Sequence, residues 1–326
     1  MPITVDAVTS LVAELVEVES VNPAFSESGS DESRLAELVA RRLDGLGLRV
    51  GRREPEPGRV TVLGTLEGAG RGPSLMLYAH LDTVGVEGME APFEPVVRGG
   101  RLFARGAYDM KGGLAACLAA AQTLVEHGPR LAGDLIVAAV ADEEVASLGM
   151  SDVLTAVIPD AAIVTEPTEL EICLSHKGFA WIDVTTHGRA AHGSRFEEGI
   201  DANLRMGRFL ARLEELERRL RTSSPHPLVG PPSLHAAVLA GGTGPSTYAE
   251  RCRLTIERRT VPGESAEDAL SEIRVILEEL RHEDSSFRGE AVTTLARDPF
   301  EAGADSPVTG ALARAAAAVL GRRPPF

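Results

Sequence analysis

The sequence predicts an α/β fold: a mixed, mostly parallel sheet between helices, with a separate α+β domain inserted near the carboxyl end. Two observations predict it. Three short apolar runs alternate with helical patterns, and each ends in histidine or acid; they span residues 75–79, 134–141 and 161–165. After Lys177 the pattern changes to alternating apolar and polar residues, which is typical of half-buried antiparallel strands.

The first domain is predicted to hold four helices and two further strands. Apolar residues recur at helical spacing in residues 5–18, 32–46, 111–127 and 147–156. Residues 48–53 and 59–66 are predicted strands separated by a turn at 54–58. Open sheets of this kind carry their functional residues at the carboxyl ends of the strands.

The inserted domain is predicted to place two helices over a small antiparallel sheet. Its strands are expected at residues 178–186, 234–240 and 251–258, and its helices at 201–221 and 265–281. Residues 291–295 and 307–320 are expected to return to the first domain. The predicted division is therefore 1–176 with 289–326 for the first domain and 177–288 for the insert.

Composition limits the classes of function. The chain has 326 residues, with 33 basic and 48 acidic side chains and a net charge of −15, which disfavours a nucleic-acid or anionic-membrane partner. Three cysteines without a CxxC pair argue against a disulfide framework and against a thiolate zinc site. The acidic, amphipathic N-terminus is unlike a signal peptide, and no apolar run is long enough to span a bilayer. We expect a cytoplasmic protein.

Histidine and carboxylate residues gather at the ends of the predicted strands. His80 and Asp82 are two apart on an extended segment, so they share a face, as suits a metal-binding histidine steadied by a carboxylate. Acids after strands are commonly helix caps or solubilising groups, but so many together favour a site. The candidate set is His80, Asp82, Asp109, Glu143, Glu144 and Glu166.

Four motifs in order, HLDTV, ARGAYDMKGG, DEEVASLG and TEPT, resemble the di-zinc amidohydrolase family of acetylornithine deacetylase, succinyl-diaminopimelate desuccinylase, aminoacylase and glutamate carboxypeptidase. The resemblance implies a metal-dependent hydrolase that cleaves the amide bond of an N-acyl amino acid or short peptide. It implies two divalent metal ions: zinc is expected, and cobalt or manganese could substitute. It also implies that the insert is a lid through which the chain forms a homodimer.

The resemblance also gives the site residues their roles. Asp109 would bridge the two metals, His80 and Glu166 would complete the shell of one, and Glu144 would serve the other. Glu143 would be the general base that takes the proton of the metal-activated water and delivers it to the leaving amine. The Asp82 carboxylate would hold the tautomer of His80, and the peptide from Asp109 to Met110 would be cis.

Three further residues of the insert match functional positions of the family. His192, in AHGS, matches a lid histidine that reaches the partner subunit's active site and helps to hold the tetrahedral oxyanion. Arg259, in ERRTVPGE, matches an arginine that binds the substrate carboxylate, although Arg258 beside it is an alternative for the exposed position. Ser246 stands where the family usually has a substrate-binding asparagine.

Alternatives stay open. A dipeptidase or carboxypeptidase could use the same metals. Family members continue with a histidine that completes the Glu144 metal site, whereas the last histidine here is His282. We therefore expect the C-terminal part of the catalytic domain to be missing, either because the chain is a fragment or through natural truncation. A catalytically impaired form that serves only in binding or dimerisation is the alternative from another class.

Overall fold

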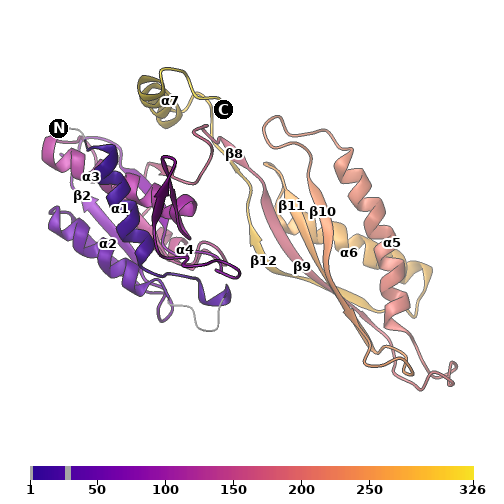
Figure 1. Cartoon of the computed structure of the whole chain (residues 1–326). Helices are drawn as coiled ribbons and strands as arrows, with labels where there is room; N and C mark the ends of the chain where they lie inside the picture. The colour runs from indigo at the N-terminus through magenta and orange to yellow at the C-terminus, as the bar shows by residue number, and fades with distance from the viewer. Residues whose placement is uncertain (1–2, 26–30) are drawn as a thin grey trace. The chain divides into compact units, whose positions relative to one another are not determined.

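The computed structural model describes residues 3–25 and 31–326 (Figure 1). The chain divides into two compact units, Met1–Leu170 and Glu171–Phe326, and each is described by itself. None of the described helices is long and apolar enough to cross a membrane.

The first unit contains a five-stranded sheet in the order β1-β2-β6-β3-β7. β3 pairs in parallel with β6 and with β7, whereas β1–β2 and β2–β6 are antiparallel. The sheet is therefore mixed, as predicted, but it is not mostly parallel. The tight turn between β1 and β2 permits only antiparallel pairing. The bounds are β1 Arg49–Arg53, β2 Thr61–Leu66, β3 Leu75–His80, β6 Leu135–Val140 and β7 Ala161–Val164.

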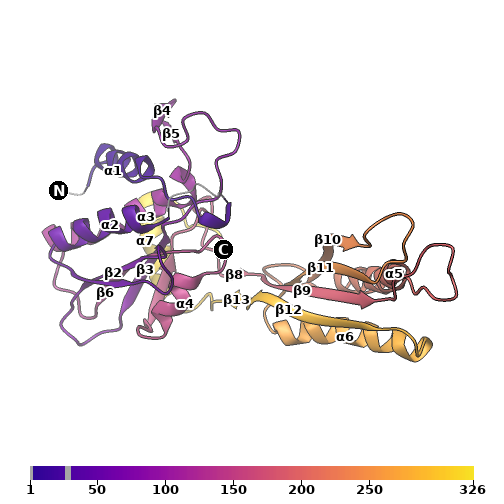
Figure 2. The same cartoon turned by 90° about the horizontal axis from the view of Figure 1, so that it is seen from below.

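The four predicted helices of this unit are confirmed, with ends shifted by a few residues. Figure 2 shows α1, α2 and α3 on one side of the sheet, where α2 contacts β1 and β2, and α3 contacts β3 and β6. Leu35, Val39 and Leu43 lie on one face of α2 and are fully buried, which is why this segment docks as a helix. The helices are α1 Val5–Glu17, α2 Ser33–Gly45, α3 Gly112–His127 and α4 Leu148–Leu154.

One hairpin was not predicted. β4 (Val96–Arg98) pairs with β5 (Arg101–Phe103) across Gly99 and Gly100, whose φ angles are 58° and 75°. Two consecutive positive φ angles suit glycine, and a Gly-Gly pair between two β-forming triplets is a recognisable hairpin signal.

The second unit contains a four-stranded antiparallel sheet in the order β10-β11-β9-β12, with both long helices packed on one face (Figures 1 and 2). Ala180, Ile182 and Val184 of β9 are fully buried against the helices, whereas Trp181 between them is 41% exposed on the open face. The predicted alternation is confirmed. The elements are β9 Gly178–His187, β10 Ser233–Gly241, β11 Arg251–Thr260, β12 Gly289–Arg297, α5 Ala202–Arg221 and α6 Ala266–Glu283.

The end of the insert differs from the expectation. β12 was expected to return to the first domain, but it pairs antiparallel with β9. A turn after α6, closed by a 2.8 Å bond from the Phe287 amide to the Asp284 carbonyl, directs the chain back along the sheet. The short pair of β8 (Ser175–His176) with β13 (Phe300–Glu301), and α7 (Pro307–Leu320), also belong to the second unit. The boundary between the two compact units lies at residue 170, and residues 289–326 group with the second unit; the division into a catalytic domain and an inserted domain stays a prediction.

Candidate metal centre

His80 is the last residue of β3, a central strand, and its side chain is 1% exposed. Its Nδ1 lies 2.9 Å from the Asp82 carbonyl oxygen, and its Nε2 lies 3.0 Å from Asp109 Oδ1. A proton on Nδ1 donated to that carbonyl leaves the Nε2 lone pair free for a metal.

The Asp82 carboxylate is not hydrogen-bonded to the His80 ring in this structure, and its predicted role stays a prediction. Its Oδ1 is 3.7 Å from His80 Nδ1, beyond hydrogen-bond distance, and the Asp82 main chain holds the ring instead. The carboxylate accepts hydrogen bonds from the amides of Glu143 at 3.0 Å and Glu144 at 3.1 Å. Through its side chain, Asp82 therefore holds the turn that contains Glu143 and Glu144, which we call the acidic turn.

Asp109 and Glu166 reach His80 from two different elements. Asp109 lies in the irregular turn Ala107–Lys111 before α3, and its peptide to Met110 is cis, as predicted. A Cβ on Gly113 would meet the Thr165 carbonyl oxygen at 2.4 Å, so only glycine lets the start of α3 approach the end of β7 so closely. Donor atoms of His80, Asp109 and Glu166 all lie within 4.8 Å of one another.

Glu143 and Glu144 follow β6 in a turn that begins at Asp142, whose φ is 61°. Glu143 Oε2 lies 3.9 Å from His80 Nε2, and the Glu143 side chain is 37% exposed. Glu144 is close enough to His80, Asp109 and Glu143 for their charges to shift its pKa. The structure thus brings all six strand-end candidates into one neighbourhood; the roles assigned to them stay predictions.

The electrostatics of the group favour a cation. Burial raises the pKa of Glu144 and of Glu166 to about 7, and neighbouring carboxylates add to that rise. Burial alone would lower the pKa of His80, but the bond to Asp109 and the surrounding carboxylates raise it to about 9. The protons bound by these groups reduce the negative charge of the carboxylates, and a bound divalent ion would neutralise the same negative charge. A nitrogen and oxygen donor set without sulfur fits zinc, and the residues present therefore fit a metal ion.

The two neighbouring arginines of β11 point to opposite faces of the sheet, as period-two alternation requires. Arg258 is 2% exposed and is bound by Glu264 and Glu272. Arg259 is 44% exposed, lies 3.0 Å from Glu257, and stacks over the Phe179 ring with its Cζ at 5.6 Å. Arg259 is thus the exposed member of the pair, as first assigned.

His192 and Ser246 lie side by side in two loops of the second unit. The Gly193 amide donates to the Ser246 carbonyl oxygen at 2.8 Å, and His192 forms an isolated bridge with Thr247. His192 Nδ1 lies 2.8 Å from Ser194 Oγ. These loops lie beyond His187 and Arg251, at the end of β9 and β11 opposite to Phe179 and Arg259.

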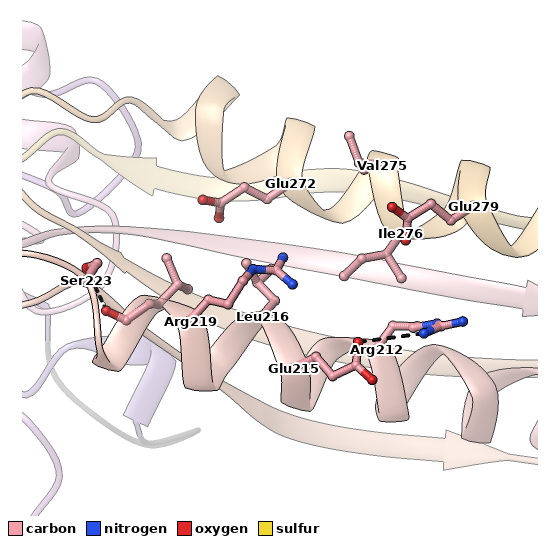
Figure 3. A pocket seen from close by; sticks show the side chains of 10 residues that line it. Arg212, Glu215, Leu216, Arg219, Ser223, Glu272, Val275, Ile276 and Glu279 are labelled. Atoms are coloured by element: carbon pink, nitrogen blue, oxygen red, sulfur yellow. Dashed lines mark hydrogen bonds and ion pairs between the residues drawn. The ribbon is translucent and has the colours of Figure 1, made fainter.

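A separate hollow of about 400 Å³ lies between α5 and α6, where Figure 3 shows charged side chains of both signs. None of the candidate residues lines it. The predicted chemistry does not lie in this hollow.

Four buried polar residues behind the acidic turn were not anticipated: Asn22, Glu32, Arg59 and Asp142, all but Arg59 at most 1% exposed. They come from segments far apart in the sequence. The only available signal was the rarity of asparagine, which occurs at positions 22 and 203 alone.

Comparison with known proteins also indicates a hydrolase. Residues 76–326 match the family described as Peptidase family M20/M25/M40. An acetylornithine deacetylase of Proteus mirabilis is 29% identical over 293 residues, which cover 87% of this chain and 72% of that protein. An N-formyl-4-amino-5-aminomethyl-2-methylpyrimidine deformylase of Bacillus subtilis is 30% identical over 269 residues, or 77% of this chain and 63% of that protein.

Solved structures share the fold. The crystal structure of aminopeptidase PepT from Bacillus cereus matches with a TM-score of 0.80 at 19% identity, covering 99% of this chain and 84% of that one. The chain spans about two thirds of the length of the curated relatives it matches. These matches do not test whether a C-terminal part is missing, and that expectation stays a prediction.

Fold, donor set and matches together define a metal-dependent hydrolase of the amidohydrolase and peptidase class. The chain belongs to Peptidase family M20/M25/M40.

Proposed function

We propose that this protein hydrolyses the amide bond of a small N-acyl amino acid in a metal-dependent reaction. The observation that carries the proposal is the convergence of His80, Asp109 and Glu166 within 4.8 Å, with the Glu143 carboxylate 3.9 Å from His80. Relatives named as a deacetylase and a deformylase support removal of a small acyl group from nitrogen.

His80, Asp109 and Glu166 would hold the first metal ion, and Glu144, with Asp109 shared, the second. Bound metal would supply Lewis-acid activation of water and of the amide carbonyl. We infer zinc from the donor set; cobalt or manganese would be accepted by the same ligands.

Glu143 would act as general base. Burial already raises the pKa of this carboxyl above its ordinary value, which suits a group that must take a proton from water and return it to the leaving amine. Its main chain is fixed by the Asp82 carboxylate, so the proton acceptor is positioned before substrate binds. Arg259, exposed on the open face of the second sheet, would bind the substrate carboxylate with its bidentate fork.

In a homodimer, each subunit would supply its His192 to the active site of the other subunit. Arg251 pairs with His187 and Arg259 with Phe179, so His192 and Arg259 are separated by the length of β11, about 25 Å at 3.3 Å per residue. One chain cannot place both side chains on a single amino-acid-sized substrate. We therefore propose that His192 serves the partner subunit's site, with Ser246 beside it as a hydrogen-bonding group. The edge strand β10, with Val238 63% and Leu239 55% exposed, would form the interface.

A dipeptidase or carboxypeptidase activity is the second candidate. It is favoured by structural neighbours that include an aminopeptidase of Bacillus cereus and a metallo-carboxypeptidase of Sulfolobus solfataricus. A cytoplasmic location fits either activity and stays a prediction.

The test is hydrolysis of N-acetyl amino acids and of dipeptides by the zinc-loaded chain, compared with Glu143→Gln. We expect preferential turnover of acyl amino acids and a loss of at least roughly 100-fold in the variant, with zinc binding retained. Glu56→Gln, the same change at an exposed turn of the same unit, is the control and should leave turnover unchanged. Near wild-type turnover by Glu143→Gln would remove Glu143 as the base, and preference for dipeptides would favour the second candidate.

A further inference from the structure

Behind the acidic turn lies a buried polar cluster formed by Asn22, Glu32, Arg59, Asp82 and Asp142. Three of its members are carboxylic acids at most 1% exposed, and Arg59, 12% exposed at its side chain, is the only cation among them. Burying carboxylates is costly unless each oxygen finds a hydrogen-bond donor. The arrangement of the donors therefore decides where these acids can lie.

The Asn22 side chain is the centre of the cluster. Its Nδ2 donates to Asp82 Oδ2 at 2.9 Å and to Asp142 Oδ1 at 3.0 Å. Its Oδ1 accepts from Arg59 Nη2 at 2.9 Å and from the Ala24 amide at 3.0 Å. Both amide hydrogens and both carbonyl lone pairs are used, and an aspartate of the same shape would offer acceptors alone.

The two carboxylates that Asn22 joins hold the main chain of the acidic turn. Asp82 accepts from the amides of Glu143 and Glu144. Asp142 Oδ2 accepts from the amides of Ala146 at 3.2 Å and Leu148 at 3.3 Å. One side-chain amide is thus linked, through two carboxylates, to four main-chain amides between residues 143 and 148.

Arg59 determines which way the Asn22 amide faces. Its Nη1 donates to Glu32 Oε1 at 2.7 Å, while Nη2 donates to Asn22 and lies 3.4 Å from Asp142 Oδ1. With the guanidinium on one side, the Asn22 carbonyl oxygen must face Arg59, and its NH₂ must face the two carboxylates.

We propose that Asn22 is a positioning residue, whose amide aligns Asp82 and Asp142 so that they hold Glu143 and Glu144 in place for reaction. The catalytic consequence rests on the proposed function. The structural part, the fixing of the turn, does not depend on it.

The structural part is tested by hydrogen exchange of the metal-free full chain, comparing wild type with Asn22→Asp. The variant should lose the donors to Asp82 and Asp142, and the amides of residues 143–148 should exchange roughly 10- to 100-fold faster, as expected for lost bonds to charged groups. Strands β3 and β6 should keep their protection. Asn203→Asp, the same change at the other asparagine, which is exposed in α5, is the matched control and should alter nothing in residues 143–148. Unchanged protection in Asn22→Asp would overturn the proposal.

A second variant covers failure to fold. If the amides of β3 and β6 also exchange fast in Asn22→Asp, that variant has not folded, and Asn22→Ser, which keeps one donor, is measured in its place. Faster amide exchange confined to residues 143–148 of Asn22→Ser supports the proposal, and exchange at the wild-type rate overturns it. In the zinc-loaded chain, kcat for an N-acetyl amino acid should fall at least roughly 10-fold with little change in KM. A fall in kcat without faster exchange would overturn the positioning role. Absence of hydrolysis in the wild type would count against the proposed function alone, because the exchange result is independent of turnover.

Discussion

Replacing Glu32 by glutamine tests what the buried cluster costs the fold. Glu32 Oε1 accepts from Arg59 Nη1 at 2.7 Å and from the Asp142 amide at 3.1 Å, but Oε2 has no partner among the residues described. Burial raises the pKa of this carboxyl from 4.5 to about 7, even though Arg59 opposes the rise. Glutamine keeps Oε1 and carries no charge at any pH.

The sign of the effect follows from proton binding. Unfolded Glu32 releases its proton near pH 4.5 and folded Glu32 near pH 7. Between these values the folded state holds the extra proton, so its stability falls as the pH rises. The shift corresponds to about 3 kcal/mol lost by wild type between pH 4.5 and pH 8. Glu32→Gln should lack this loss and should gain about 3 kcal/mol relative to wild type over the same range.

Urea unfolding at pH 5, 6, 7 and 8, followed by circular dichroism, measures this difference. Trp181, the single tryptophan, lies in the second unit, so its fluorescence reports a transition that Glu32→Gln should leave unchanged. Glu56→Gln controls for removal of one negative charge from the same unit. The reasoning would be refuted if the difference in free energy of unfolding between variant and wild type did not change with pH, or if the variant became the less stable protein as the pH rises. Either result would mean that the Glu32–Arg59 ion pair stabilises the fold by more than the burial of Glu32 destabilises it.

Four further outcomes are expected. Calorimetric titration with zinc should show one tight equivalent per chain, because three donors lie within 4.8 Å and Glu144 is not among them; two equal tight equivalents would contradict this. Arg258→Ala should destabilise the second unit by about 3 kcal/mol or more by leaving two acids without their buried partner. Arg259→Ala should instead raise KM with a stability change below about 0.5 kcal/mol, and the reverse pattern would exchange the two roles. Val238→Lys should shift a dimer to monomer in sedimentation, and an unchanged dimer would place the interface elsewhere.

The sequence predicted the strand-end site because neighbouring parallel strands end at the same edge. β3 lies between β6 and β7, so His80, the turn after Val140 and Glu166 had to meet once the strands were recognised. The cluster around Asn22 could not be predicted in this way. Its bonds to Asp82 and Asp142 join residues 60 and 120 positions apart, and no periodic pattern encodes such contacts. The prediction that β12 returns to the first domain was wrong for a related reason. An alternating pattern identifies a strand but does not identify the sheet that the strand joins.

Register explains why the Asp82 carboxylate serves the acidic turn and not the His80 ring. His80 pairs with Val140 in the parallel ladder of β3 and β6, and the Leu81 amide donates to the Val140 carbonyl at 2.7 Å. Two residues further on, Asp82 therefore lies beside Asp142, and its carboxylate faces the amides that follow. An isolated HxD pattern suggests a side-chain pair, but the turn that follows the neighbouring strand supplies the amide donors that the Asp82 carboxylate binds.

Asp82→Asn separates the two interpretations. If the carboxylate held the His80 ring, the variant should lose roughly 10- to 100-fold in zinc affinity, as is typical for the partner of a metal-binding histidine. Since the Asp82 carbonyl oxygen holds His80 Nδ1 at 2.9 Å, we expect a smaller loss for the first zinc equivalent. Turnover should nevertheless fall about as far as in Glu143→Gln, because an amide NH₂ now meets the Glu143 or Glu144 amide, both of which donate. Zinc calorimetry with an N-acetyl amino acid assay measures both, and a 100-fold loss of first-site affinity with turnover preserved at saturating zinc would restore the side-chain interpretation.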